Sequence, residues 1–440
     1  MGKIERTSYN LYNKQIEMSI FPKDFLWGAA TSAHQVEGGN LNDWSEWEIA
    51  NAGRLAREAE SKFGHLPSWP MIREQAIKPE NYISGLACNH YHRFREDFDI
   101  AKSLGHNAHR FSIEWSRIEP EEGKFDEVEI EHYREVIKVL RERNMEPFVT
   151  LWHWTIPLWL RDRGGVESKQ FPEYFTRYAQ YVVRRLGDEV VFWMTLNEPT
   201  SVIGAAYAAG LWPPQKKNLL AALRVFRHLA AAHRRGYWAI RQIQANAQIG
   251  FGNVLSFIEP AHAWNPFDQL SVLISKFWSN QYFFLLTGED THDYIAIQNY
   301  FHNRVAFPWR LQNKNEKVSD MSWELYPESL YYLLKEWKKY NKPLYITENG
   351  LADACDKHRG WFIREAIKNL ERAISEGIDV RGYFYWSLLD NFEWDKGFWP
   401  RFGLVEIDYK NALERKIRPS AWEYKKIIEH LMEDHIVKDD

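Results

Sequence analysis

The sequence predicts an α/β protein built as a single (β/α)8 barrel over residues 1–440, with long loops at the carboxyl ends of its strands. Short apolar segments alternate with amphipathic helical segments, and eight of the apolar segments have strand character. No Pro-, Gly- or Ser-rich linker interrupts the alternation, and no repeat of fixed length occurs. The first strand segment, residues 27–30, lacks the glycine-rich phosphate turn that a doubly wound sheet would place there.

The predicted strands are short, and several end in polar residues. In order, they are 25–32, 108–115, 147–154, 191–198, 248–257, 293–300, 343–347 and 380–389. The predicted helices are 93–104, 129–143, 175–186, 219–243, 330–340, 361–376 and 421–432. Residues 40–88 show only weak periodicity, so we expect a long loop with short helices over one face of the barrel.

Composition and charge exclude several classes of protein. A net charge of −4 and a pI near 6.5 give no electrostatic basis for binding nucleic acid or an anionic membrane. Cys88 and Cys355 are too few for a disulfide framework. Residues 1–6 are largely polar where a signal peptide needs an apolar segment, and no apolar run is long enough to span a membrane. The sequence therefore predicts a soluble, cytoplasmic protein and leaves its oligomeric state open.

Aromatic residues make up 15% of the chain and include 21 tryptophans, more than an ordinary core requires. Core packing accounts for most of them. The remainder suits a carbohydrate site, because the C–H faces of sugars pack on aromatic rings while their hydroxyls need fixed polar partners.

Two of the predicted strands end in the same way. Residues 191–199 and 344–350 each contain an apolar run followed by a glutamate, Glu198 and Glu348. A buried carboxylate is costly unless it has a partner or a function. Side chains at the carboxyl ends of barrel strands share one mouth, which gathers Gln35, Arg110, His153, Asn197, Glu198, Tyr300, Glu348 and Trp386.

Two facing carboxylates indicate hydrolysis of a glycosidic bond. In the retaining route the pair lies about 5–5.5 Å apart: one attacks the anomeric carbon, and the other protonates the leaving oxygen and later activates water. We expect Arg110 and Tyr300 to hold the attacking carboxylate ionised, and the like-charged neighbour to keep the acid protonated. Environment, rather than residue type, would then assign the two roles.

Six segments, in order and over essentially the whole chain, resemble glycoside hydrolase family 1. They are 25–38, 110–115, 150–154, 195–199, 346–350 and 385–394. The resemblance implies that Glu348, in Ile-Thr-Glu-Asn-Gly, is the nucleophile and that Glu198, in Leu-Asn-Glu-Pro, is the acid/base. Arg110 and Tyr300 match the supports of the nucleophile, and Asn197 matches the partner of the sugar 2-hydroxyl.

The same resemblance implies the remaining contacts of the sugar. Gln35, His153 and Glu393 match residues that bind the other hydroxyls of the non-reducing sugar, with Trp394 beside them and Trp386 as the stacking platform. Glu393 would repel a phosphate, which favours an unphosphorylated sugar. The implied activity is that of a retaining exo-β-glycosidase that acts on small β-D-glucosides, galactosides, fucosides or oligosaccharides without a cofactor or a metal.

The chain departs from the family pattern at several positions. Gln298 begins the segment Gln-Asn-Tyr where Asn-Tyr-Tyr is usual, so it is a candidate for altering the pocket. His34 and Thr155 stand where Tyr and Asp are frequent. Similarity to the archaeal-type branch, rather than to the common bacterial one, is carried by residues 42–44 and 114–117.

Two other functions remain as alternatives. The first is a catalytically inactive, glycan-binding barrel of the same family; such relatives typically lose one of the two glutamates, and both are present here. The second is a barrel metalloenzyme, because His90 and His92 have the H-x-H spacing of barrel metal hydrolases. Entry into the helix that follows is the simpler interpretation of these histidines.

For several individual residues, a purely structural role is weighed against a role in the site. Glu114 is expected to form an internal salt bridge or, as the second choice, to influence the site. Arg110 pairing with Glu114 is the alternative to its supporting a catalytic acid. For His153 the alternative is a satisfied core histidine, and for Trp386 it is packing alone.

Overall fold

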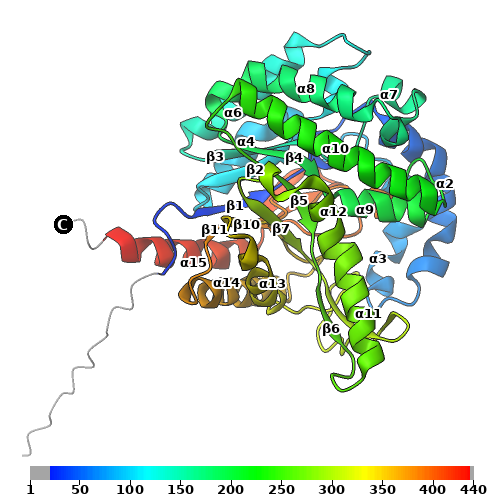
Figure 1. The fold of residues 1–440 in the computed structure, drawn as a ribbon, viewed down its shortest axis with the longest axis vertical. Helices are drawn as coiled ribbons and strands as arrows, with labels where there is room; N and C mark the ends of the chain where they lie inside the picture. Colours follow the sequence, from blue (N-terminus) through cyan, green and yellow to red (C-terminus); the bar gives the residue numbers. More distant parts are fainter. Residues whose placement is uncertain (1–19, 437–440) are drawn as a thin grey trace, which may run out of the picture.

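The computed structural model describes residues 20–436 and contains a closed barrel of eight parallel strands (Figure 1). The barrel strands are β1 (Leu26–Ala30), β2 (Ala108–Ser112), β3 (Glu146–Trp152), β4 (Phe192–Asn197), β5 (Gln248–Val254), β7 (Ile295–Asn299), β10 (Leu344–Asn349) and β11 (Val380–Trp386). Neighbours in this order pair with each other, and β1 pairs with both β2 and β11 to close the barrel. The predicted (β/α)8 fold is confirmed, and each of the eight predicted strands overlaps one strand of the barrel.

Helices follow the strands, and each predicted helix is present within a few residues of its predicted limits. They are α4 (His90–Ser103), α6 (Glu127–Glu142), α8 (Phe171–Leu186), α10 (Leu219–Ile243), α13 (Ser329–Trp337), α14 (Arg359–Ser375) and α15 (Pro419–Ile436). α6 and α10 begin where Asp126 and Asn218 accept hydrogen bonds from N–H groups of the first turn. Short helices occupy several loops: α1 (Ala33–Val36), α5 (Trp115–Ile118), α7 (Leu158–Asp162), α9 (Pro199–Val202) and α12 (Tyr282–Thr287).

The prediction of a long loop with short helices at 40–88 is wrong. α2 (Asp43–Phe63) is a helix of 21 residues, and α3 (Trp69–Ala76) follows it. α2 begins with a capping box, in which Asn42 accepts from the Ser45 N–H at 2.9 Å and the Ser45 hydroxyl accepts from the Asn42 N–H at 3.0 Å. Its buried side includes Asp43 and Glu48 beside tryptophans and alanines, so burial there does not follow the apolar residues alone.

Two smaller sheets lie outside the barrel and were not predicted. One contains β6 (Phe257–Pro260), β8 (His302–Ala306) and β9 (Arg310–Leu311), and the other contains β12 (Val405–Asp408) and β13 (Glu414–Ile417). The predicted strand 248–257 is therefore divided, because the chain leaves the barrel after β5 and pairs with β8 as β6. Figure 1 shows β6 projecting away from the barrel together with α11 (Pro266–Lys276).

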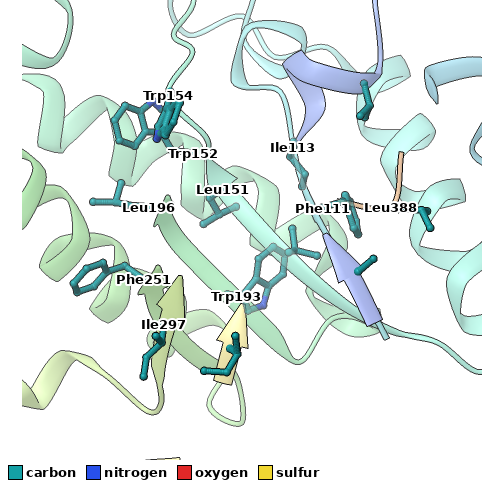
Figure 2. Packing of buried hydrophobic residues seen from close by; sticks show 14 of the residues in the cluster. Phe111, Ile113, Leu151, Trp152, Trp154, Trp193, Leu196, Phe251, Ile297 and Leu388 are labelled. Carbon is teal, nitrogen blue, oxygen red and sulfur yellow. The ribbon is translucent and has the colours of Figure 1, made fainter. Parts of the chain in front are cut away.

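Successive side chains of a strand point to opposite faces of the sheet, so neighbouring residues of one barrel strand pack in different clusters of the core. Trp193 of β4 packs in the large cluster with Leu151 of β3, Phe251 of β5 and Ile297 of β7 (Figure 2). Its neighbour Met194 belongs to a second cluster, to which the strands contribute Ala30, Ala108, Phe148, Tyr345 and Phe384. Trp27, Trp115, Trp152 and Trp193 are fully buried, so core packing explains part of the tryptophan content.

The cell compartment was predicted from the N-terminal segment and from the lack of a long apolar run. The N-terminal segment 1–6, from which a cytoplasmic location was predicted, lies outside the described residues, so that location stays a prediction. Among the helices of residues 20–436, none combines the length and the apolarity needed to cross a membrane. Both cysteines are free; Cys88 is buried and Cys355 is exposed.

Candidate active site

One cavity of about 210 Å³ lies where the barrel strands end, and it brings together the predicted side chains. Nine of the ten predicted site residues line it: Gln35, His153, Asn197, Glu198, Tyr300, Glu348, Trp386, Glu393 and Trp394. The tenth, Arg110, is fully buried on β2 and hydrogen-bonds to two of the nine. The sequence therefore located the cavity, while the chemical role of each residue stays a prediction. We refer to this space as the sugar cavity, after the ligand that the sequence predicts.

The barrel strands deliver these side chains at their carboxyl ends. Asn197 and Trp386 are the last residues of β4 and β11, and Glu348 is next to last in β10. The register of β4 against β5 shifts at 194–197, and that of β10 against β7 shifts at 346–348. Such irregularities redirect a side chain from the regular pleat, and here they occur beside the two glutamates.

Three donors converge on the carboxylate of Glu348. Arg110 Nη1 donates to Oε1 in a buried ion pair, and Gln298 Nε2 donates to the same oxygen at 2.7 Å. The Tyr300 hydroxyl donates to Oε2 at 2.7 Å. Burial, together with the charge of Glu348, holds the pKa of Tyr300 well above its ordinary value, so the tyrosine remains a donor. This arrangement suits an ionised carboxylate.

The surroundings of Glu198 are different. Its backbone has φ 39° and ψ 59°, a left-handed conformation that is uncommon for a residue with a Cβ. Within residues 20–436, Ser201 is the one side chain that hydrogen-bonds to it, donating to Oε2 at 2.8 Å. Burial raises the pKa of Glu198 to about 8, and the charge of Glu348 adds to the rise. Glu198 is therefore suited to carry a proton near neutral pH.

Asn197 has a fixed amide orientation. Its Oδ1 accepts from Arg110 Nη2 at 2.5 Å and from Gln298 Nε2 at 2.7 Å, so its Nδ2 turns toward His153 Nε2 at 3.1 Å. Burial, with a contribution from the Arg110 charge, holds the pKa of His153 well below its ordinary value. A neutral His153 that accepts at Nε2 carries its proton on Nδ1. That atom is buried without a partner in the described chain, and it is available to a sugar hydroxyl.

Glu393 lies in the loop after β11, beside Gln35 of α1. Gln35 Nε2 donates to Glu393 Oε2 at 3.5 Å and to the Phe392 carbonyl at 2.8 Å. Burial raises the pKa of Glu393 to about 7, despite the nearby Lys396 ammonium. Lys396 also lines the sugar cavity, and its Nζ donates to Asp395 Oδ1 at 2.9 Å. The acidic partner of Lys396 offsets the positive charge near Glu393.

Aromatic rings form one wall of the cavity. His153 lies nearly parallel to Trp386 and to Trp394, at centroid distances of 6.1 Å in both cases. Trp154 packs on Trp394 at 4.5 Å, and Trp212 packs on Trp154 at 4.7 Å. These rings supply apolar faces beside polar groups, which is the combination that a pyranose requires.

The structural alternatives for Glu114 and Arg110 are wrong. Within residues 20–436, Glu114 has no ion pair; it accepts instead from Ser116 Oγ at 2.7 Å and from Thr155 Oγ1 at 2.9 Å. Arg110 pairs with Glu348 rather than with Glu114. The predicted salt bridge failed because a buried carboxylate can be satisfied by neutral donors, which a sequence search for opposite charges does not consider.

The histidines of the H-x-H motif enter a helix, as the simpler interpretation predicted. His90 is the first residue of α4, and its Nδ1 lies 2.7 Å from Asp97 Oδ2. In the part of the chain that the structure describes, no group of three or more His, Cys, Asp or Glu side chains is arranged to hold a metal ion.

Sequence analysis missed several residues of the cavity. Ser201 lies one helical turn after Glu198, and that spacing is a usable signal. Trp154 belongs to the segment 150–154 that resembles the family, but no role was predicted for it. Trp212 comes from a loop without a recognisable sequence pattern. Gln298 was singled out as a departure, and the structure shows that it bridges Asn197 and Glu348.

Comparison with known sequences gives a family for this site. The sequence model of Glycosyl hydrolase family 1 matches residues 17–294 and 289–432. The chain belongs to glycosyl hydrolase family 1. The resemblance found in the sequence is thereby confirmed.

Relatives of this family 1 hydrolase match nearly its whole length. A 1,4-β-D-glucan glucohydrolase of Thermotoga neapolitana is 31% identical, over 94% of this chain and 99% of the relative. β-Glucosidase A of Acetivibrio thermocellus is 32% identical, over 93% of this chain and 98% of the relative. The solved structure of a β-glycosidase from Pyrococcus horikoshii has a TM-score of 0.81 at 34% identity and covers 94% of this chain and 96% of that one.

Proposed function

We propose that this family 1 hydrolase is a retaining exo-β-glycosidase of the β-glucosidase type. It acts on unphosphorylated β-D-glucosides, galactosides or fucosides through a covalent glycosyl-enzyme intermediate, with the chain as one catalytic domain. The observation that carries the proposal is the contrast between two glutamates in one cavity. Glu348 receives three donors, while burial and the charge of Glu348 raise the pKa of Glu198 to about 8.

The reaction follows from these two environments. The Glu348 carboxylate attacks the anomeric carbon, and the bond from that carbon to the leaving oxygen breaks as Glu198 transfers its proton to this oxygen. Glu198, now a carboxylate, takes a proton from water, and the water oxygen attacks the same carbon. The bond to Glu348 breaks, which releases the sugar and restores both groups.

The remaining cavity residues support a single, unphosphorylated sugar ring as the bound group. A volume of about 210 Å³ lies below that of ordinary drug-sized pockets, which favours one ring over a chain. His153 Nδ1 offers a donor, and Glu393 offers a carboxyl group to neighbouring hydroxyls. A phosphate in place of a hydroxyl would meet the Glu393 carboxyl group, which is ionised above its pKa of about 7 and then repels the phosphate. The printed names of the relatives, a glucohydrolase and a β-glucosidase, support the same substrate class.

Covalent labelling tests the proposal directly. A 2-deoxy-2-fluoro-β-glucosyl donor with an activated leaving group should leave a stable ester, and peptide mass spectrometry should locate it on Glu348. A Glu348→Gln variant should remain unlabelled under the same conditions. Labelling of any other residue, or no labelling while hydrolysis proceeds, would contradict the proposed nucleophile.

The two alternative functions predict different measurements. A glycan-binding barrel without activity would bind glucosides and release no product from nitrophenyl β-glucoside. A metalloenzyme would lose activity in excess EDTA, whereas the proposed enzyme should keep full activity.

A further inference from the structure

A second cavity adjoins the sugar cavity. It has a volume of about 800 Å³ and lies between η4 (Ile203–Ala208) with the start of α10 on one side, and η5 (Phe277–Gln281) with the β8–β9 hairpin on the other. Ser201, Val254 and Phe301 line both cavities. We refer to this second space, which extends outward from these three residues, as the apolar groove.

The apolar groove begins at the acid/base side of the site. Ser201 Oγ donates to Glu198 Oε2, so the shared residue touches the group that is proposed to protonate the leaving oxygen. Gln35, His153 and Glu393, which are proposed to bind the non-reducing sugar, line the sugar cavity but not the groove. A leaving group that departs past Glu198 and Ser201 therefore enters the apolar groove.

The chemistry of the groove differs from that of the sugar cavity. No Asp, Glu, Lys, Arg or His is among the described residues that line it. Its walls include Leu219, Leu223, Phe226, Ile258, Trp278 and Leu311. Two of its hydroxyls already have acceptors, since Thr200 Oγ1 donates to Asn253 Oδ1 at 2.6 Å and Ser279 Oγ donates to the Ser275 carbonyl at 2.7 Å. Ser201 Oγ also has its acceptor, so Ser256, Ser275 and Asn303 are the polar side chains of the lining that remain for the hydroxyls of a second sugar.

The rim of the groove exposes large apolar side chains to water. Leu219 is 72% exposed, Leu311 64% and Trp309 56%. On the adjoining helix α11, Phe267, Leu270 and Leu273 are also exposed. These three recur at a spacing of three residues, so they share one side of α11. Large exposed apolar side chains at the rim of a groove are typical of a binding site for an apolar ligand.

We propose that the apolar groove binds the leaving group of an amphiphilic β-glycoside, in which a long alkyl chain is joined to a single sugar ring. This inference rests on the proposed glycosidase activity. The sugar ring occupies the sugar cavity, the glycosidic oxygen lies beside Glu198, and the chain extends past Ser201 along the groove. Burial of each methylene group removes apolar surface from water, which stabilises the bound state without a directional contact.

A chain-length series tests the proposal on the unaltered enzyme. With methyl, hexyl, octyl and decyl β-D-glucosides, all below their micelle concentrations, kcat/KM should rise about two- to fourfold per added methylene group until the groove is filled. The proposal would be overturned if kcat/KM did not change along the alkyl series. It would also be overturned if kcat/KM rose with length only in a parallel series of cello-oligosaccharides. Failure to hydrolyse even methyl and nitrophenyl β-glucosides would instead overturn the underlying glycosidase proposal.

A groove-filling variant provides the structural test. Gly204 lines the groove, and a Cβ added there would meet no atom within 4 Å, so Gly204→Phe is chosen to introduce a ring at the groove wall. The ratio of kcat/KM for decyl over methyl glucoside should fall at least tenfold. The matched control is Gly53→Phe on α2, which lies outside the groove and should keep the ratio. An unchanged ratio in folded Gly204→Phe would contradict the proposal.

A second variant covers the case in which Gly204→Phe does not fold. Trp309 is largely exposed at the groove wall, so Trp309→Ala should be tolerated and should lower the decyl-to-methyl ratio severalfold. Trp238→Ala removes an exposed tryptophan of α10 that does not line the groove, and it should leave the ratio unchanged. Equal ratios in both tryptophan variants would count against the groove.

Discussion

The ends of β4 and β10 carry the same residue type in opposite surroundings. Glu198 and Glu348 are 7% and 3% exposed, so burial alone does not distinguish them. The Glu348 carboxylate accepts hydrogen bonds from a guanidinium, an amide and a phenol, whereas the Glu198 carboxyl group accepts from one serine hydroxyl among the described residues. The number and charge of the donors therefore separate an anion from an acid within a single cavity.

Loss of Glu348 should have the largest effect. Glu348→Gly removes the attacking group, so turnover of nitrophenyl β-glucoside should fall on the order of 10⁴-fold or more. Formate or azide should restore turnover, because a small anion can occupy the space left by the carboxylate. Initial rates with and without the added anion provide the measurement. Residual activity within tenfold of the wild type would contradict the assigned role.

The effect of replacing Glu198 on the rate should depend on the leaving group of the substrate. Glu198→Ala should lower kcat/KM for alkyl glucosides by about 10²–10⁴-fold, since these need a proton on the leaving oxygen. Dinitrophenyl glucoside needs little protonation, so its cleavage to the glycosyl enzyme should suffer least. A plot of rate against leaving-group acidity should therefore be steeper in the variant. Equal losses for all leaving groups would assign Glu198 a different role.

Gln298 should act as a positioning residue for both Asn197 and Glu348. Gln298→Met keeps the approximate length but removes the amide that bridges Asn197 and Glu348. A hydrogen bond to a charged group contributes about 1.5–3 kcal/mol, so kcat should fall about 10- to 100-fold. KM should change less, because the amide contacts protein groups in this structure.

A shorter amide is the control for the Gln298 prediction. Gln298→Asn retains the functional group, so it should retain more activity than Gln298→Met, and fluoroglucosyl labelling of Glu348 should slow in the same order. A loss in Gln298→Met that appears entirely in KM would contradict a role in positioning the nucleophile.

Replacing each glutamate by glutamine should also change the thermal stability of the protein in opposite directions. The pKa of Glu198 is about 8 in the folded protein and near its ordinary value when unfolded. Between these pH values the unfolded chain has released a proton that the folded protein keeps, so stability falls as pH rises toward 8. Glu198→Gln should therefore raise the Tm by a few degrees at pH 8, with little gain near pH 4.

The matched substitution at β10 should have the opposite effect. Glu348→Gln leaves the guanidinium of Arg110 buried without its charged partner, which is destabilising. Its Tm should fall below that of the wild type at pH 8. Scanning calorimetry of both variants makes the comparison, and a lower Tm for Glu198→Gln than for Glu348→Gln would contradict it.

The smallest effect should come from the single donor to Glu198. The Ser201 hydroxyl favours the carboxylate form and so lowers the pKa of Glu198. Ser201→Ala should raise this pKa, and the alkaline limb of the kcat/KM profile should move upward by about half a pH unit. A shift toward lower pH would show that another group controls the alkaline limb.

The sequence was most informative where a residue's position along a strand fixes its direction. Glu198, Glu348 and Trp386 could be assigned to one mouth because barrel strands all point their carboxyl ends the same way. α2 was not predicted because its buried side combines the acidic residues Asp43 and Glu48 with tryptophans and alanines, so burial there does not follow the apolar residues alone. The orientation of the Asn197 amide could not be predicted either, since it depends on donors from two other strands.

The apolar groove was equally inaccessible to sequence reasoning. Its walls come from α10, β6, η5 and the β8–β9 hairpin, and the last three occupy segments where no element was predicted or where a predicted strand is divided. Exposed apolar residues such as Trp309 and Leu311 have no periodic pattern that separates them from core residues. Only their common location in space shows that they border one cavity.

The hydrogen bond between Gln35 and Glu393 joins residues that are 358 positions apart, and β1 must meet β11 to close the barrel. During synthesis, the ribosome therefore releases most of the polypeptide before the sugar cavity can be complete. A nascent chain that ends before Glu393 should therefore fail to bind an immobilised glucoside, even if much of its barrel has already formed.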